Sequence, residues 1–155
     1  MSAYDLAVIG AGPVGLSAAI TAAEDGAHVA LIGHGTIGGT CVNVGCVPSK
    51  TMIRATETLH HANAGRFAGI AASGQLADWS GVIAQKDDLV ASLRQSKYID
   101  QLGNYDGIDY LPGPATFDSD GLLFDGAPLG AEKIIIASGS QASVPDIPGS
   151  TISPI

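Results

Sequence analysis

Apolar residues near the start of the chain gather into two short runs, with a glycine-rich turn and an alanine-rich stretch between them. The first run, residues 4–9, predicts a short buried strand. The alanine-rich stretch, residues 16–25, has the composition of a helix, and Gly26 follows it as a cap. The second run, residues 29–32, predicts another strand. This order of elements is typical of the opening of a doubly wound nucleotide-binding fold.

The middle of the chain predicts a loop followed by two helices. Residues 33–45 are rich in Gly, Thr and Asn, so we expect a loop there. Pro48 fits the first turn of a helix that runs from residue 49 to about residue 61. Apolar residues recur at helical spacing from residue 81 to about residue 101, which predicts one long surface helix.

The last part of the chain changes to short strands. Residues 109–111, 115–117 and 122–124 predict strands separated by Pro-Gly and Asp-Gly turns, as in a small β-meander, and residues 133–137 predict a final strand. With 21 glycines and 5% aromatic residues, the composition suits parallel strands buried between helices. We therefore expect an α/β fold with a doubly wound, Rossmann-like parallel sheet and a small β-meander.

Length and charge narrow the class of protein. The 155 residues suffice for one domain with a modest core. The formal net charge of −8 disfavours nucleic acid as a partner, because phosphate backbones repel an acidic surface. No apolar run approaches the ~20 residues of a membrane span, and the first residues lack the basic region of a secretory signal. We expect a cytoplasmic protein with no membrane partner.

Three glycines between the first predicted strand and helix have the spacing of a phosphate-binding turn. Gly10, Gly12 and Gly15 form the pattern GxGxxG. The first Gly permits a tight turn, the second lets the backbone approach a pyrophosphate, and the third lets the helix pack close to the strand. The phosphates would lie at the amino end of the helix, where free N–H groups favour anions. The alternative, a turn shaped by packing alone, does not require this spacing.

The end of the second predicted strand lacks an acid. Dinucleotide sites of this kind usually carry Asp or Glu there, and its carboxylate binds the ribose hydroxyls. Here Gly33 occupies the position and His34 follows. A neutral His34 imidazole could bind the ribose or the adenine; the alternative is a histidine in a solvated loop. We expect weaker binding on the adenosine side, with the phosphate contacts retained.

The two cysteines, Cys41 and Cys46, lie close together in the sequence. In a reducing compartment such a pair is more often redox-active or metal-binding than structural. Five residues of regular helix rise ~7.5 Å, whereas a disulfide needs Cα atoms roughly 4.4–6.8 Å apart. The pair can close only where the backbone leaves a straight helix, which Asn43 and Gly45 allow. A helix that begins near Cys46 would stabilise its thiolate and make it reactive.

Residues 38–50 read Gly-Gly-Thr-Cys-Val-Asn-Val-Gly-Cys-Val-Pro-Ser-Lys. This segment, one short loop after a GxGxxG unit, resembles the redox-active signature of the pyridine nucleotide–disulfide oxidoreductases. The resemblance implies an FAD-dependent enzyme that takes electrons from NADPH and works as a homodimer on a small-molecule or metal-ion substrate. Residues 1–155 would then be the N-terminal part of its FAD-binding domain, with the NAD(P)H-binding and dimerisation domains outside this chain.

The resemblance also assigns roles to single residues. Cys46 resembles the cysteine next to the flavin, Cys41 the thiol that meets the substrate, and Lys50 a lysine near flavin N5 whose charge favours the reduced flavin. The alternatives are a solvated helix lysine at position 50 and, at Ala115, a strand residue without ligand contact. The expected cofactor-binding residues are Gly10, Gly12, Pro13, Gly15, Gly33, His34, Gly35, Gly39, Thr40, Lys50, Ala115, Ala137, Ser138 and Gly139.

Other segments bring the chain close to one branch of the family. Residues 46–55, 93–98 and 113–117 most resemble the mercuric reductases. Hg(II) is a soft ion for which thiolates are the natural ligands, so we expect Cys41 and Cys46 to bind it transiently during its reduction to Hg(0). The alternatives are a disulfide reductase like lipoamide dehydrogenase or glutathione reductase and, in another class, a non-catalytic FAD-binding protein. We expect residues 1–155 alone to be inactive.

Overall fold

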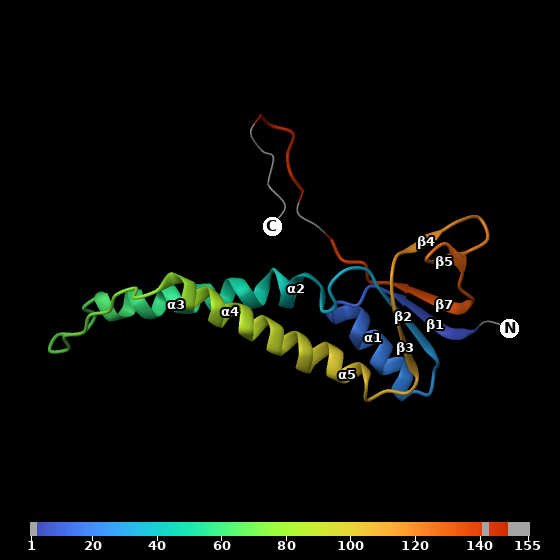
Figure 1. The fold of residues 1–155 in the computed structure, drawn as a ribbon, viewed down its shortest axis with the longest axis horizontal. Coiled ribbons are helices and arrows are strands. Elements are labelled where there is room, and N and C mark those ends of the chain that lie inside the picture. Colours follow the sequence, from blue (N-terminus) through green and yellow to red (C-terminus); the bar gives the residue numbers. More distant parts are fainter. Residues whose placement is uncertain (1–2, 141–142, 149–155) are drawn as a thin grey trace.

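A four-stranded parallel sheet forms the centre of the computed structural model, which describes residues 3–140 and 143–148. The strand order is β3-β2-β1-β7, so the first strand lies inside the sheet. The strands are β1 (Tyr4–Ile9), β2 (Val29–Gly33), β3 (Ile108–Pro112) and β7 (Ala131–Ile136). All their pairings are parallel, which confirms the expected sheet (Figure 1).

Helix α1 (Pro13–Glu24) connects β1 to β2 and packs on one face of the sheet (Figure 1). It begins at Pro13, earlier than the predicted start at Leu16, because proline is well suited to the first helical turn, where no intrahelical partner exists for its N–H. The helix ends just before Gly26, whose φ of 87° is a left-handed conformation that glycine adopts easily. Leu16 and Ala19 are buried against the sheet.

The two faces of the sheet enter different hydrophobic cores, as the alternation of side chains along a strand requires. Leu6, Val8 and Leu31 pack with α1, whereas Ala7 and Ile32 pack on the other side with Leu122. The expected meander is confirmed, and its apolar residues cover the second face of the parallel sheet. Its strands are β4 (Ala115–Phe117), β5 (Leu122–Phe124) and β6 (Ala127–Pro128).

The two edges of the parallel sheet differ from the sequence-based expectations. β3, grouped in the sequence with the meander strands, pairs instead with β2, from Val29 with Ile108 to Gly33 with Pro112. The last predicted strand, 133–137, is β7, and it begins earlier, at Ala131. β7 pairs only with β1 in the described part of the chain, and its residues Ile134, Ile135 and Ile136 are exposed.

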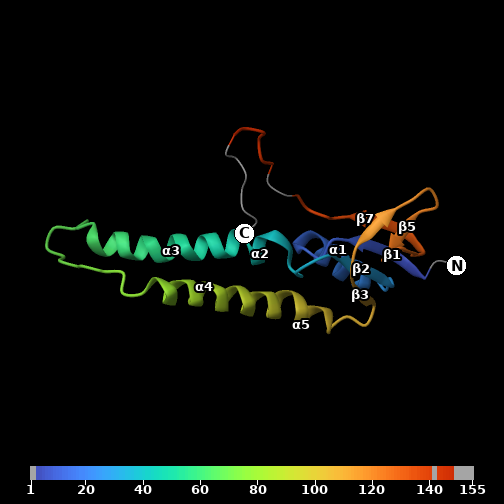
Figure 2. The ribbon, with the colours of Figure 1, turned by 45° about the horizontal axis from the view of Figure 1, so that its top comes forward.

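Two long helices project from the sheet as a hairpin and lie side by side in both views (Figures 1 and 2). The predicted helix 49–61 is α3 (Cys46–Asn63), which begins at the second cysteine. The predicted helix 81–101 begins earlier, at Trp79, because the Asp78 carboxylate accepts hydrogen bonds from the Ser80 and Gly81 N–H groups.

The second arm of the hairpin has three consecutive helical segments, α4 (Trp79–Arg94), the π-helical turn η1 (Gln95–Ile99) and α5 (Asp100–Leu102). The predicted single helix is therefore interrupted by a π-helical turn, in which the Tyr98 side chain is buried in the core beside Val42. Among the described residues, no helix combines the length and apolar character needed to cross a bilayer.

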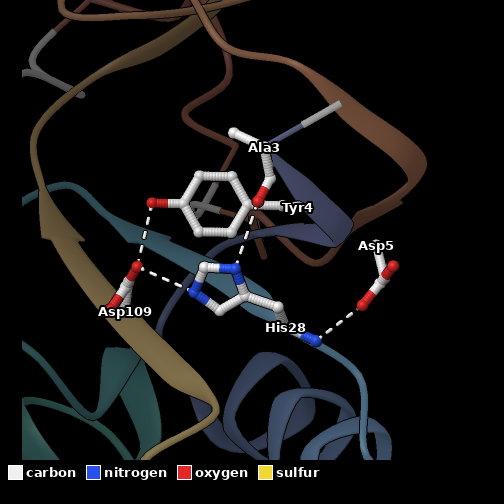
Figure 3. A network of polar contacts seen from close by, with 5 residues as sticks. All are labelled: Ala3, Tyr4, Asp5, His28 and Asp109. Atoms are coloured by element: carbon white, nitrogen blue, oxygen red, sulfur yellow. Dashed lines mark hydrogen bonds and ion pairs between the residues drawn. The ribbon is translucent and has the colours of Figure 1, made fainter. Parts of the chain in front are cut away.

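A polar cluster joins the amino ends of β1, β2 and β3 (Figure 3). The Tyr4 hydroxyl donates to Asp109 Oδ2 at 3.0 Å, and His28 Nε2 lies 3.1 Å from the same oxygen. His28 Nδ1 lies 3.1 Å from the Ala3 carbonyl oxygen, and the His28 backbone N–H donates to Asp5. Because residues at or just before the start of each of the three strands contribute a group, the cluster helps to fix their register at the edge opposite the carboxyl ends.

We predict that Asp109→Ala lowers the free energy of unfolding by about 1 kcal/mol, because two hydrogen bonds at a half-exposed position are lost. Urea denaturation of the purified chain measures this. Asp106→Ala is the matched control, since Asp106 is an exposed residue of the turn before β3, and we expect a change within ~0.5 kcal/mol. Equal effects of the two substitutions would contradict the role of the cluster.

Candidate functional site

A cleft of about 360 Å³ opens where the carboxyl ends of β1, β2 and β7 face the amino end of α1. Ligands of open α/β sheets bind at this edge, outside the carboxyl ends of the strands. The structure brings most of the expected cofactor-binding residues together in the cleft wall: Gly10, Gly12, Pro13, Gly33, His34, Gly35, Gly39, Thr40, Ala137, Ser138 and Gly139. Cys41 also lines it.

Each of the three glycines of the GxGxxG turn is needed for a different structural reason. A Cβ at Gly10 would lie 2.2 Å from the Ala137 carbonyl oxygen, and Gly10 has a φ of 118°. A Cβ at Gly15 would lie 1.7 Å from the Gly10 carbonyl oxygen. At Gly12 the nearest atom to such a Cβ would be the Gly39 Cα, at 3.8 Å. Gly10 and Gly15 are therefore required by packing, whereas Gly12 keeps the cleft open.

The open backbone at Gly12 and the amino end of α1 fit a pyrophosphate. The helix leaves N–H groups without intrahelical partners there, and its dipole favours anions. Gly12 and Gly39 approach each other closely, since a Cβ at Gly39 would lie 3.0 Å from the Gly12 Cα. The donors and the absence of side chains at this point suit a dinucleotide such as FAD.

Three of the expected cofactor-binding residues lie outside the cleft wall. Gly15 is buried where α1 packs on β1. Ala115, on β4, packs against the cluster that contains Leu122, in keeping with a strand residue that serves the core. Lys50 is exposed on the first turns of α3.

Tyr110, which the sequence did not single out, lines the cleft beside Gly33. Gly33 is buried, and a Cβ there would lie 2.7 Å from the Tyr110 hydroxyl oxygen and 2.8 Å from the Ala11 Cβ. Burial raises the pKa of Tyr110 above its ordinary value. The phenol thus stands at the end of β2, at the position that carries Gly33 in place of an acid.

The two cysteines lie on either side of a break between helices. The expected loop 33–45 contains a short helix, α2 (Gly39–Asn43), so that expectation is wrong in part. The helix stops at Val44, and Gly45 has φ −114° and ψ −108°, after which α3 begins at Cys46. The break confirms the predicted departure from a straight helix, and it places Cys46 close enough to raise the pKa of the Cys41 thiol.

Both cysteines are free thiols in the structure, with Cys41 half-buried and Cys46 exposed at the start of α3. The hydrogen bond with Cys46 raises the pKa of Cys41, burial raises it further, and the positive charge of Lys50 opposes the shift. The thiol at the cleft wall therefore keeps its proton more firmly than an ordinary cysteine, and the nearby lysine favours the thiolate.

Side chains from the second arm of the hairpin support the cysteine turn. The Asn43 side chain donates to the carbonyl oxygens of Ile37 and Gly39, both at 2.9 Å. Arg94 of α4 donates to the Asn43 Oδ1 at 2.9 Å. Tyr98 packs close to Gly38, where a Cβ would lie 3.3 Å from its ring. These contacts hold α2 between the sheet and the hairpin, and sequence spacing alone could not have revealed the Arg94 contact.

The parallel sheet, the glycine turn at its carboxyl edge and the thiol pair beside the cleft are typical of a dinucleotide-binding α/β domain. The family model described as pyridine nucleotide-disulphide oxidoreductase matches residues 4–153. The chain belongs to this family. Membership of this family implies FAD and a pyridine nucleotide as cofactors.

Individual relatives cover nearly all of this chain. The mercuric reductase of Staphylococcus aureus is 46% identical over 147 residues, which are 94% of this chain and 27% of the relative. Dihydrolipoyl dehydrogenase 3 of Pseudomonas aeruginosa is 41% identical over 158 residues, covering 96% of this chain and 33% of the relative. The HOCl-induced flavoprotein disulfide reductase RclA from Escherichia coli superposes with a TM-score of 0.77 at 33% identity, covering 97% and 32%. The chain thus spans between 27% and 33% of the length of these proteins.

Two glycine substitutions should separate packing from ligand binding. We predict that Gly15→Ala lowers the free energy of unfolding by about 3 kcal/mol or more, because its Cβ overlaps the Gly10 carbonyl. Gly12→Ala should stay within about 1 kcal/mol of the wild type but weaken ADP binding, because the methyl group enters the cleft. Thermal unfolding and calorimetric titration measure the two effects. Unchanged ADP affinity in a folded Gly12→Ala variant would contradict the assignment.

The environment of Cys41 predicts how fast it is alkylated. Cys46→Ala removes the largest cause of the raised pKa, so more thiolate forms at pH 8 and Cys41 should react faster with iodoacetamide. Lys50→Gln removes the charge that opposes the shift, so Cys41 should react more slowly. Mass spectrometry of Cys41 over a pH series checks both directions. Identical pH profiles in the three proteins would refute the coupling.

Proposed function

We propose that residues 1–155 form the N-terminal part of the FAD-binding domain of a longer, dimeric enzyme that uses NADPH to reduce Hg(II) to Hg(0). The observation that supports this most directly is that Cys41 lines the glycine-lined cleft on α2, with Cys46 just across the helix break at the start of α3. The 46% identity to a mercuric reductase supports the choice of substrate.

The residues of the cleft would hold FAD. The turn from Gly10 to Pro13 and the amino end of α1 would bind the pyrophosphate. Gly35, Gly39 and Thr40 would line one side of the cofactor, and the segment after β7 the other, with Ala137, Ser138 and Gly139. When bound, FAD would supply the transfer of two electrons from NADPH to the cysteine pair.

The cysteine pair would carry out the step at the substrate. As thiolates, Cys41 and Cys46 bind Hg(II), which prefers soft sulfur ligands. When Hg(II) accepts two electrons and leaves as Hg(0), the two sulfur atoms have each lost one electron and form a disulfide. The positive charge of Lys50 favours the Cys41 thiolate. The helix that begins at Cys46 adds the favourable end of its dipole.

A disulfide reductase is the second candidate, and two relatives support it. One is the dihydrolipoyl dehydrogenase at 41% identity, and the other is the solved flavoprotein disulfide reductase with a TM-score of 0.77. In that function one thiolate of the pair attacks a substrate disulfide, and the second displaces the mixed disulfide to release the reduced product. Both candidates need the same flavin cleft and the same cysteine turn.

We predict that the FAD-loaded chain takes up two electrons beyond those of the flavin in an anaerobic dithionite titration, because the cysteine pair cycles between disulfide and dithiol. A Cys46→Ser variant should accept only the electrons of the flavin, while its FAD affinity stays within about threefold, since Cys46 does not line the cleft. Equal electron uptake by both proteins would refute a redox-active pair.

A rate assay of NADPH oxidation by the whole enzyme separates the two candidate functions. Rapid NADPH oxidation with Hg(II) bound to a small thiol, and slow oxidation with lipoamide or glutathione disulfide, would support mercury reduction. The reverse order would support the disulfide reductase. Residues 1–155 alone should not oxidise NADPH steadily. Sustained Hg(II) reduction by them would contradict the proposal that turnover needs other parts of a longer enzyme.

A further inference from the structure

The carboxyl end of β2 combines an absent side chain with a phenol that takes its place. Gly33 is the last residue of β2 and pairs with Pro112 on β3. Tyr110 lies on the same strand as Pro112 and pairs with Leu31. Its ring reaches along β2 to Gly33, where its hydroxyl oxygen lies 2.7 Å from the position of a Cβ. Residue 33 and Tyr110 therefore compete for one space.

A side chain at position 33 and the Tyr110 ring, in its present place, exclude each other. Any side chain at position 33 would meet the Tyr110 hydroxyl and the Ala11 Cβ at 2.8 Å, both closer than real Cβ contacts. The phenol could swing away, but the Ala11 Cβ is fixed to the backbone of the turn. The structure thus has no room for the Asp or Glu that would bind a ribose here.

The Tyr110 hydroxyl is available to a ligand. It lines the cleft together with Gly33 and His34. Within residues 3–140 and 143–148, no protein group forms a hydrogen bond with it, whereas the hydroxyls of Tyr4 and Tyr105 both have carboxylate partners. Burial raises the pKa of Tyr110, so the hydroxyl remains protonated at neutral pH and can both donate and accept.

We propose that the Tyr110 hydroxyl binds the ribose hydroxyls at the adenosine end of the dinucleotide, in place of a carboxylate at position 33. This inference rests on the proposed dinucleotide cleft and names the residue that binds the ribose of the dinucleotide. A neutral phenol makes one ordinary hydrogen bond where a carboxylate makes charge-assisted ones. The ribose is therefore held less tightly, and the pyrophosphate contacts carry a larger share of the affinity.

The test compares two ligands and two proteins by calorimetric titration. ADP carries the ribose hydroxyls, and 2′,3′-dideoxy-ADP lacks them. Tyr110→Phe should weaken ADP binding about two- to tenfold, the effect of one neutral hydrogen bond. The same substitution should leave the affinity for 2′,3′-dideoxy-ADP unchanged, because the lost partner is absent from that ligand. The unfolding midpoint of Tyr110→Phe should match the wild type, since the ring remains in place.

Two control variants make the result specific. Tyr105→Phe removes a hydroxyl that donates to Glu24 at 3.3 Å outside the cleft, and ADP affinity should not change. His34→Ala tests the other polar side chain near Gly33. If His34→Ala, and not Tyr110→Phe, weakens ADP but spares the dideoxy ligand, the histidine binds the ribose and the proposal is overturned. Equal loss of both ligands in Tyr110→Phe, or no loss, also overturns it.

A parallel titration with FAD separates this proposal from the proposed function. If the wild type binds ADP in the predicted pattern but does not bind FAD, the flavin function fails and the role of Tyr110 stands. If FAD binds equally well to the wild type and to Tyr110→Phe, the flavin function stands and the role of Tyr110 fails.

Discussion

The close approach of three backbone segments at Gly10 is the constraint on which the rest of the site depends. The end of β1, the start of α1 and the residue after β7 meet there, with the Ala137 and Gly10 carbonyl oxygens in the space that Cβ atoms would need. The Gly10 N–H donates to the Ile32 carbonyl, and the Ala137 N–H donates to the Ile9 carbonyl, both at 2.7 Å. This junction places the amino end of α1 at the carboxyl edge of the sheet. The cleft exists because no side chain fills the space between that helix end and the ends of the strands.

The segment that carries the cysteines is attached to the same junction on one side and to the helical hairpin on the other. The Gly38 N–H donates to the Ala11 carbonyl at 2.9 Å, which attaches the turn to the glycine loop. On its other side Arg94 reaches Asn43 across 51 positions of sequence. The short helix α2 thus lies between the sheet and the hairpin, so the position of Cys41 depends on the packing of both.

The local patterns that could be predicted were those whose cause lies within a few residues. GxGxxG between a strand and a helix, and two cysteines separated by Asn43 and Gly45, specify their turns by spacing alone, and the structure places Gly10 and Gly12 in the cleft wall. Tyr110 could not be found in this way, because its role depends on β3 pairing in parallel with β2. The sequence does not predict α2, because Gly, Thr and Asn disfavour a helix; in the structure the Asn43 side chain holds this short helix through bonds to Ile37, Gly39 and Arg94.

The exposed isoleucines of β7 also give the chain a tendency to self-associate in solution. Ile134, Ile135 and Ile136 lie on an edge strand with backbone groups that can extend a sheet, and such an edge invites association of like molecules. The net charge of −8 acts against this by making copies repel one another. Added salt screens that repulsion while leaving the apolar edge intact, so concentrated stocks of this chain should keep best at low ionic strength.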